Sequence, residues 1–229
     1  MRARTRLVTS VVVLVLLVSW LASVGLAKPR EDMSQYTTRE VHVDAPTMPY
    51  PGTDVGVEGV VFYDCGVILW AQCATGWGTL VMQTCGDTIC KSGCCLTSVA
   101  MVFTYYGATA KNPAQLNTCM GNMACLFSFT HADSNCDENK ATLVAYCPYS
   151  LSTMRSSILN NGDPPILYLK KIVGSVTYKH WVVVRRINGD DGALSSYWIN
   201  DPAGGKFRCL TDYTNNGWVP TTLAIYGLQ

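Results

Sequence analysis

Charged residues are scarce in this sequence and almost balanced in sign. Only 14% of the 229 residues are charged and the formal net charge is +1, whereas roughly a quarter of the residues of an average soluble domain carry a charge. A balanced chain gives no electrostatic reason to expect binding to nucleic acid, to an acidic ligand or to a membrane surface. Internal repeats and low-complexity segments are also absent, which excludes repeat architectures such as solenoids.

Long apolar runs are absent beyond residue 27. The one run that is present, residues 7–27, follows three arginines and ends in small residues at Gly25 and Ala27. This pattern predicts a secretory signal peptide, residues 1–27, that is cleaved after Ala27. The alternative is an uncleaved signal anchor, because a membrane-spanning helix needs ~20 apolar residues. Both interpretations send the rest of the chain out of the cytosol, to a secreted, extracellular or lumenal location.

Short C-x-x-C pairs, which are typical of zinc sites, are absent as well, although the chain holds 11 cysteines. No histidine lies near enough in sequence to complete a metal site, so neither a metal nor another cofactor is expected. In an oxidising compartment these cysteines predict disulfide bonds instead. Because 11 is odd, at least one thiol has to stay without a disulfide partner within the chain.

The composition divides the exported chain into two parts. Residues 28–58 hold most of the local charge, together with prolines, and are interpreted as a linker, an N-terminal arm or a propeptide. Residues 59–229 are long enough for one domain with a sizeable core. The first part of that domain, up to residue 93, is rich in Gly, Cys and Trp and predicts short strands and disulfide-bridged loops.

Periodicity predicts helices before strands in the rest of the domain. Helices are expected at residues 92–107, from Asn112 onwards and at 152–159, and strands at 164–172, 180–187 and 196–200. Helices first and strands later, without βαβ alternation, predict an α+β fold with a mainly antiparallel sheet.

The segment KSGCCLTSVAMVFTYYG, residues 91–107, is the strongest predicted helix. Ser92 stands where an N-cap is expected and Gly107 where a helix commonly ends, and a helix that is apolar nearly all round is a buried one. Cys94 and Cys95 then lie in its first turn. There the helix dipole and the free backbone N–H groups favour thiolate over thiol, so both cysteines are candidate nucleophiles.

A thiolate nucleophile needs a base, and the base needs a group that orients it. Of the three histidines, His42 lies in the charged arm, His131 in a polar, loop-like stretch and His180 at the start of a strand. The turn INGDDG, residues 187–192, predicts a hairpin that places His180 opposite Asp201, within a slip of one or two positions. The alternatives are a strand-end histidine without a catalytic role and an aspartate that only shapes a turn.

Several motifs, in this order, resemble those of papain-fold cysteine peptidases related to the bacteriocin-processing, double-glycine peptidases. They are GCCLTS at 93–98 with its lead-in from Thr88, the helix start NPAQLN at 112–117, HWVVV at 180–184 and INDPAG at 199–204. The resemblance runs from about residue 68 to the C-terminus. It implies a papain-like fold, in a stand-alone secreted peptidase-like domain, with the nucleophile at the N-terminus of a buried helix packed on the sheet.

Carried over residue by residue, the resemblance implies that Cys94 is the nucleophile, His180 the general base and then acid, and Asp201 the orienting group. Cys95 stands where relatives have Gly or Ala, so it is implied to bridge or to pack. The implied function is a secreted cysteine peptidase that hydrolyses a peptide or protein substrate through a thioester. No nucleic acid, and no membrane beyond a possible N-terminal anchor, is implied as a partner. We expect Cys94 to be the one unpaired cysteine and the other ten to form five disulfides.

The chain departs from the common papain-fold pattern at the oxyanion hole. Many of these enzymes have Gln six residues before the nucleophile, and this chain has Thr88. The Thr88 hydroxyl can donate a hydrogen bond, and Gln83 or Gln72 are further candidates. Two other functions stay open. One is another acyl-transfer enzyme of the same fold, such as an amidase or peptidyl transferase, and the other is a non-catalytic, disulfide-rich binding protein in which Cys94 is one end of a bridge.

Overall fold

The structure, a computed structural model, describes residues 60–108 and 111–229 of the chain. The predicted signal peptide, residues 1–27, and the charged segment 28–58 lie outside the described residues, as does His42. Within the two described ranges, no helix is long and apolar enough to cross a membrane.

A seven-stranded sheet forms the centre of the described domain. Its strands are β1 (Val61–Asp64), β2 (Ala141–Pro148), β3 (Ile166–Val173), β4 (Val176–Gly189), β5 (Tyr197–Asp201), β6 (Lys206–Cys209) and β7 (Val219–Leu228). The order is β2-β7-β3-β4-β5-β6, with β1 also paired to β4, and the pairings between these strands are antiparallel. The predicted α+β class with a mainly antiparallel sheet is confirmed.

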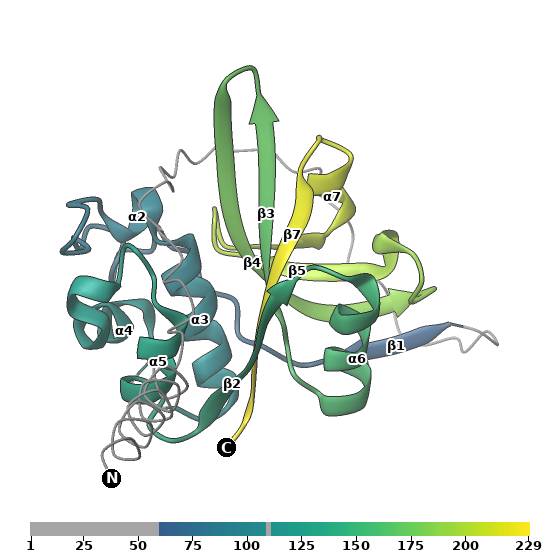
Figure 1. The fold of residues 1–229 in the computed structure, drawn as a ribbon, viewed down its shortest axis with the longest axis horizontal. Helices are drawn as coiled ribbons and strands as arrows, with labels where there is room; N and C mark the ends of the chain where they lie inside the picture. Colours follow the sequence, from purple (N-terminus) through teal and green to yellow (C-terminus); the bar gives the residue numbers. More distant parts are fainter. Residues whose placement is uncertain (1–59, 109–110) are drawn as a thin grey trace, which may run out of the picture. The chain divides into compact units, whose positions relative to one another are not determined.

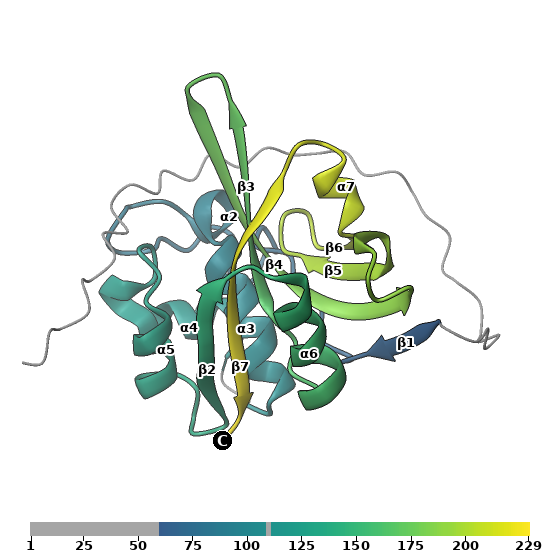
Figure 2. The ribbon, with the colours of Figure 1, turned by 45° about the vertical axis from the view of Figure 1, so that its right-hand side comes forward.

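Helices cover both sides of this sheet. They are α2 (Ile89–Ser92), α3 (Cys94–Tyr105), α4 (Pro113–Met120), α5 (Phe129–Asn135), α6 (Leu151–Asn161) and α7 (Thr211–Thr214), with short 3-10 turns at Gly121–Met123 and Leu194–Ser196. Figures 1 and 2 show α2 to α5 on one side of the sheet and α6 and α7 on the other. The candidate residues Cys94, His180 and Asp201 come from α3, β4 and β5, so the candidate site lies where α3 meets the sheet.

Local capping explains where most of these helices begin and end. Asn112 caps α4 in a capping box with Gln115, and Gly162, with a φ of 74°, ends α6 in the left-handed region, which glycine adopts without strain. The expected cap at Ser92 is wrong. An extra turn, α2, precedes the nucleophile helix, and Ser92 is its last residue, donating from Oγ to Asp87 over 2.8 Å. Gly93 is the N-cap of α3.

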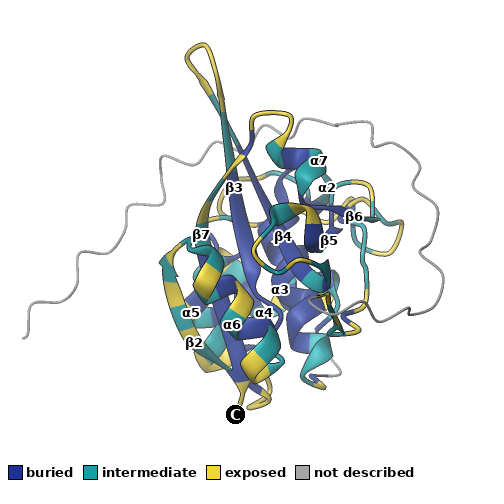
Figure 3. Cartoon of the chain, turned by 90° about the vertical axis from the view of Figure 1, so that its right-hand side faces the viewer, coloured by how far each residue is buried: buried dark blue, intermediate teal, exposed yellow. Residues whose placement is uncertain are grey.

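The sheet separates two hydrophobic cores because alternate residues of a strand point to opposite faces. In β3, Ile166 and Tyr168 belong to the core that contains α3, whereas Leu167 and Leu169 belong to the core that contains α6. Ser98 Oγ donates to the backbone carbonyl of Trp181 over 3.2 Å and joins α3 to β4. Figure 3 shows α3 and the middle of the sheet buried.

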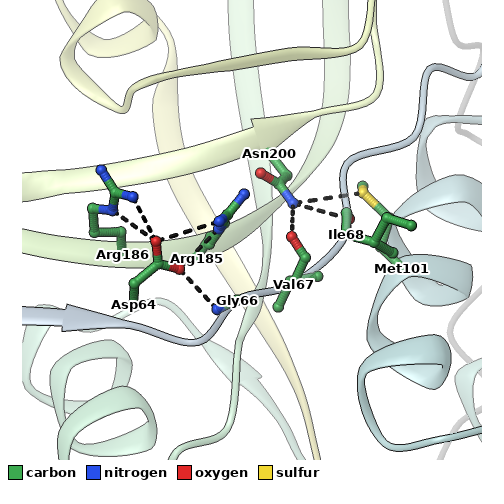
Figure 4. A network of polar contacts seen from close by, with 8 residues as sticks. All are labelled: Asp64, Gly66, Val67, Ile68, Met101, Arg185, Arg186 and Asn200. Atoms are coloured by element: carbon green, nitrogen blue, oxygen red, sulfur yellow. Dashed lines mark hydrogen bonds and ion pairs between the residues drawn. The ribbon is translucent and has the colours of Figure 1, made fainter. Parts of the chain in front are cut away.

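An ion-pair network fixes the first strand to the sheet (Figure 4). Asp64, at the end of β1, accepts hydrogen bonds from Arg185 Nε over 2.8 Å and from Arg186 Nη2 over 2.6 Å. Neighbouring residues of a regular strand point to opposite faces, but β4 has an irregular register with β5 between Val184 and Arg186. This bulge lets both arginines reach one carboxylate.

Three disulfides join the loops and helices on the α3 side of the sheet. They are Cys73–Cys90, Cys85–Cys125 and Cys119–Cys136. Disulfides are typical of an oxidising, extracellular or lumenal environment. The expectation of five disulfides is wrong, because five cysteines are free in the structure: Cys65, Cys94, Cys95, Cys147 and Cys209.

The strand order explains why two of the free cysteines, Cys147 and Cys209, do not pair with each other. Cys147 lies on β2 and Cys209 on β6, which stand at opposite ends of the strand order. Five spacings of ~4.8 Å separate these strands, whereas a disulfide needs two Cα atoms within ~7 Å. Cys95, on α3, is buried in the core. Parity requires only that at least one cysteine is free, and the expectation that all ten cysteines other than Cys94 pair overestimated the number of bridges.

Candidate active site

Cys94 is the first residue of α3 and is only 1% exposed. Its position depends on Gly93, where the chain passes from α2 into α3. A Cβ atom at Gly93 would lie 2.5 Å from the Ile89 carbonyl oxygen and 2.9 Å from the Ile89 Cα, closer than side chains and backbone ever approach. Glycine therefore allows the two helical segments to meet directly before the nucleophile candidate.

His180 and Asp201 form a buried pair. His180 Nε2 lies 2.7 Å from Asp201 Oδ1, and since an ionised carboxylate only accepts, the imidazole donates this bond. The predicted hairpin is present, but β4 and β5 pair Val183 with Asn200, so the register is slipped by two positions from the one that places His180 opposite Asp201. The two side chains meet along a diagonal of the ladder, which remains within reach of long side chains.

Asp201 is held on several sides. Oδ1 also accepts from the Ala203 backbone N–H over 2.9 Å, and Oδ2 accepts from the Tyr213 hydroxyl over 2.8 Å. Arg208 Nε lies 3.2 Å from Oδ2 and forms an ion pair without hydrogen-bond geometry. Because the carboxylate is fully buried, these partners fix its orientation toward His180.

The electrostatics of the pair favour a charged imidazole. Burial alone would lower the pKa of His180, but the charge and hydrogen bond of Asp201, together with a hydrogen bond with Cys94, raise the pKa well above its usual range. Burial would raise the pKa of Asp201, but His180, Arg208 and Tyr213 hold it below its usual range. A protonated His180 that is hydrogen-bonded to Asp201 is the state that the surroundings stabilise.

This arrangement brings the three residues of the predicted triad together. His180 uses Nε2 for Asp201, which leaves Nδ1 as the ring nitrogen for the hydrogen bond with Cys94. Each residue comes from a different element: Cys94 from α3, His180 from β4 and Asp201 from the end of β5. Such a set can hold a thiolate beside an imidazolium, which is the chemistry of nucleophilic acyl transfer.

Asn200 couples the nucleophile helix to the strand that carries Asp201 (Figure 4). Its Nδ2 donates to the backbone carbonyls of Val67 and Ile68, each over 3.0 Å, and contacts Met101 Sδ of α3 at 3.9 Å. Asn200 is fully buried. Asn200 therefore joins the strand that carries Asp201 to α3 through a buried contact.

Two aromatic residues that the sequence analysis did not identify, Tyr213 and Trp218, cover His180. The Tyr213 ring centroid lies 5.4 Å from that of His180, and the Trp218 centroid lies 6.3 Å from it. Both are buried. They shield the bond between His180 and Asp201 from water, and a shielded charge pair is stronger than an exposed one. The only signal that could have found Tyr213 and Arg208 is their closeness in sequence to Asp201.

The candidates for a side-chain oxyanion donor lie in different surroundings. Thr88 caps α2, and its hydroxyl accepts from the Lys91 backbone N–H. Gln83 is exposed in a turn. Gln72 is fully buried, donates from Nε2 to the Cys90 carbonyl over 2.7 Å and from its backbone N–H to the Pro202 carbonyl over 2.9 Å. Gln72 therefore links the turn before Cys94 to the turn after Asp201.

Two alternatives from the sequence are placed elsewhere. His131 lies in α5, rather than in the expected loop, and its backbone carbonyl and ring contact Asn135. Cys95 packs in the core, where burial raises the pKa of its thiol well above the usual range. Neither belongs to the group formed by Cys94, His180 and Asp201.

Comparison of the chain with protein-family models, with curated proteins and with solved structures finds no match.

Proposed function

We propose that residues 59–229 form a secreted, papain-like cysteine peptidase that hydrolyses peptide bonds through Cys94, His180 and Asp201. The observation that supports it most is the buried hydrogen bond of 2.7 Å between His180 and Asp201, with Cys94 in hydrogen-bond contact with the same imidazole. An isolated buried histidine would not need a fully buried carboxylate behind it. The likeness to the bacteriocin-processing peptidases is part of this proposal and rests on the sequence motifs alone.

The proposed reaction has two steps. The Cys94 thiolate attacks the substrate carbonyl carbon, and the His180 imidazolium gives its proton to the leaving amine as the C–N bond breaks, so a thioester remains on Sγ. Water then attacks the thioester carbonyl while His180 takes its proton, and the S–C bond breaks to release a carboxylic acid. Asp201 keeps the imidazole oriented and stabilises its charge throughout.

The oxyanion of each tetrahedral intermediate needs two donors. The Cys94 backbone N–H is one, because the first N–H groups of a helix have no partner within the helix. For the second we favour the Gln72 amide over Thr88 and Gln83, since Gln72 is buried next to the turn that precedes Cys94. Because Cys94 is almost fully buried, a peptide reaches this site only when the surrounding side chains move apart.

Hydrolysis of a mixed peptide library, followed by mass spectrometry, tests the proposed peptidase activity. The variant Asp201→Asn then tests the role of the aspartate in that activity. Asparagine can accept the His180 bond but lacks the charge, so we expect kcat/KM to fall by roughly 10- to 100-fold. This is less than the ~10⁴-fold loss in a serine protease triad, because a thiol ionises more readily than a hydroxyl. Without that charge the raised pKa of His180 falls, and the alkaline limb of the pH profile should move to lower pH.

Tyr213→Phe is the matched control for this variant. It removes one hydrogen bond to Asp201 Oδ2 and keeps the carboxylate charge, so the alkaline limb should move much less than in Asp201→Asn. An unchanged rate and an unchanged pH profile in Asp201→Asn would contradict the role given to this aspartate.

A further inference from the structure

The β3–β4 hairpin extends beyond the rest of the sheet (Figures 1 and 2). Strand β7 pairs with β3 only as far as Lys170, and β5 pairs with β4 only from Val183 onwards. In the part of the chain that the structure describes, residues 171–178 therefore pair only with one another. The hairpin end is a two-stranded projection with both edges open.

Aliphatic side chains cluster at the tip of this projection. Ile172 is 62% exposed, Val173 51% and Val176 39%, and they flank a turn at Gly174 with a φ of 59°. Figure 3 shows the tip as an exposed end on an otherwise buried pair of strands. Single exposed aliphatic residues are ordinary, but a cluster at the end of a projecting element marks a surface that contacts an apolar partner.

Lysines follow the aliphatic residues on both strands, on the side away from the turn. Lys170 and Lys179 lie directly opposite each other, and Lys171 is opposite Tyr178. Like charges in directly opposite positions destabilise a hairpin. Burial, with the charge of Lys170, lowers the pKa of Lys179 to about 8. No aspartate or glutamate occurs from residue 164 to residue 186, so the hairpin is a locally basic element in a chain whose formal net charge is only +1.

The change from aliphatic to basic side chains occurs along the length of the hairpin, and it occurs on both of its faces. Directly opposite residues share a face, so on one face the pair of Ile172 and Thr177 is followed by two lysines. On the other face the pair of Val173 and Val176 is followed by Lys171 with Tyr178. The step from aliphatic to basic is two residues, or ~6.6 Å along a strand. Interfacial elements bury their apolar side chains about 5–10 Å into the boundary between headgroups and acyl chains.

We propose that the tip of the β3–β4 hairpin docks end-on to an anionic phospholipid surface. Ile172, Val173 and Val176 enter the acyl boundary, and Lys170 and Lys171 contact the headgroup phosphates. A protein groove would recognise one face of the hairpin, whereas a lipid surface contacts both faces equally, as the distribution of aliphatic and basic residues requires. The net charge of +1 gave no reason to expect membrane contact, because it averages over this local basic element. This docking does not depend on the proposed peptidase activity.

Co-sedimentation with lipid vesicles tests this docking, with the protein purified from the medium of the expressing cells. Vesicles of equal parts phosphatidylcholine and phosphatidylglycerol should bind the protein, and vesicles of phosphatidylcholine alone should bind it much more weakly. Lys170→Gln with Lys171→Gln should weaken binding to the anionic vesicles by roughly 30-fold. Ile172→Ser with Val173→Ser should weaken it by at least about tenfold, because two aliphatic side chains leave the acyl boundary.

A matched control is Val144→Ser with Leu228→Ser, which replaces two aliphatic residues that are 54% and 73% exposed on other strands of the sheet. This control should bind as the wild type does, and the melting temperatures of all variants show whether the fold is kept. No binding to anionic vesicles would overturn the proposal and leave a protein as the partner of the tip. Equal binding to both kinds of vesicle, or equal binding by the hairpin variants and the control, would overturn it too.

Discussion

Replacing Cys94 by serine is expected to lower peptide hydrolysis by at least about 10³-fold, because a serine hydroxyl does not ionise beside an imidazolium as a thiol does. The change exchanges one small atom for another in a buried position, so the melting temperature should change little. The loss should appear in kcat while substrate binding persists, since the sulfur takes part in bond formation rather than in recognition. Steady-state kinetics on a peptide cleaved by the wild type measures both.

Cys95→Ser is the matched control for Cys94→Ser. It makes the same change one residue further along the same buried helix, at a thiol that packs in the core. We expect it to keep activity, with some loss of stability from the buried hydroxyl. If Cys95→Ser were inactive and Cys94→Ser active, the nucleophile would be Cys95 and the assignment of Cys94 would be wrong.

Replacing His180 by alanine is expected to lower kcat/KM by about 10²- to 10⁴-fold, the range that general acid–base catalysis contributes. The fold should persist although the change leaves a buried carboxylate without its imidazole. Asp201 keeps the Ala203 N–H, the Tyr213 hydroxyl and the nearby Arg208 charge. Those partners offset the desolvation of an ionised side chain in the protein interior.

His131→Ala is the control for His180→Ala. His131 lies on α5 and contacts Asn135, away from the group around Asp201, so activity should stay at the wild-type level. A loss of activity in His131→Ala together with an active His180→Ala would move the base to another histidine. Circular dichroism of both variants separates such a result from unfolding.

The sequence was sufficient to predict the elements that local chemistry determines. Apolar content identified α3. Asn112 identified the start of α4, and Gly162 identified the C-terminal end of α6. The turn at 187–192 identified the β4–β5 hairpin, but the observed register differs by two positions from the predicted one, and a bulge near Arg185 changes it by one position along the ladder. A bulge that serves an ion pair with Asp64, more than 100 residues away in sequence, leaves no local signal.

The surroundings of the candidate triad could not be predicted for the same reason. Tyr213 and Trp218 reach His180 because α7 and the loop before β7 fold back over β4. Their effect depends on tertiary packing, which periodicity does not report. The number of disulfides was overestimated for a related reason, because cysteine parity says nothing of the strand order that keeps Cys147 and Cys209 apart.

Native alkylation with iodoacetamide tests the central claim most directly, because exposure and chemistry predict different outcomes for the five free thiols. Exposure alone ranks the half-buried Cys65 and Cys147 first and the nearly inaccessible Cys94 last. The Cys65 thiol is disfavoured chemically, since burial and two nearby carboxylates raise its pKa to about 12.

If Cys94 is a nucleophile activated by His180, brief labelling at neutral pH followed by peptide mapping should place the first label on Cys94. The rate of that labelling should fall sharply in His180→Ala, and the labelled protein should lose its hydrolytic activity in proportion to the label. A first label on Cys147 with Cys94 unmodified, or Cys94 recovered in a disulfide of the mature protein, would contradict the peptidase proposal and favour the disulfide-rich binding protein.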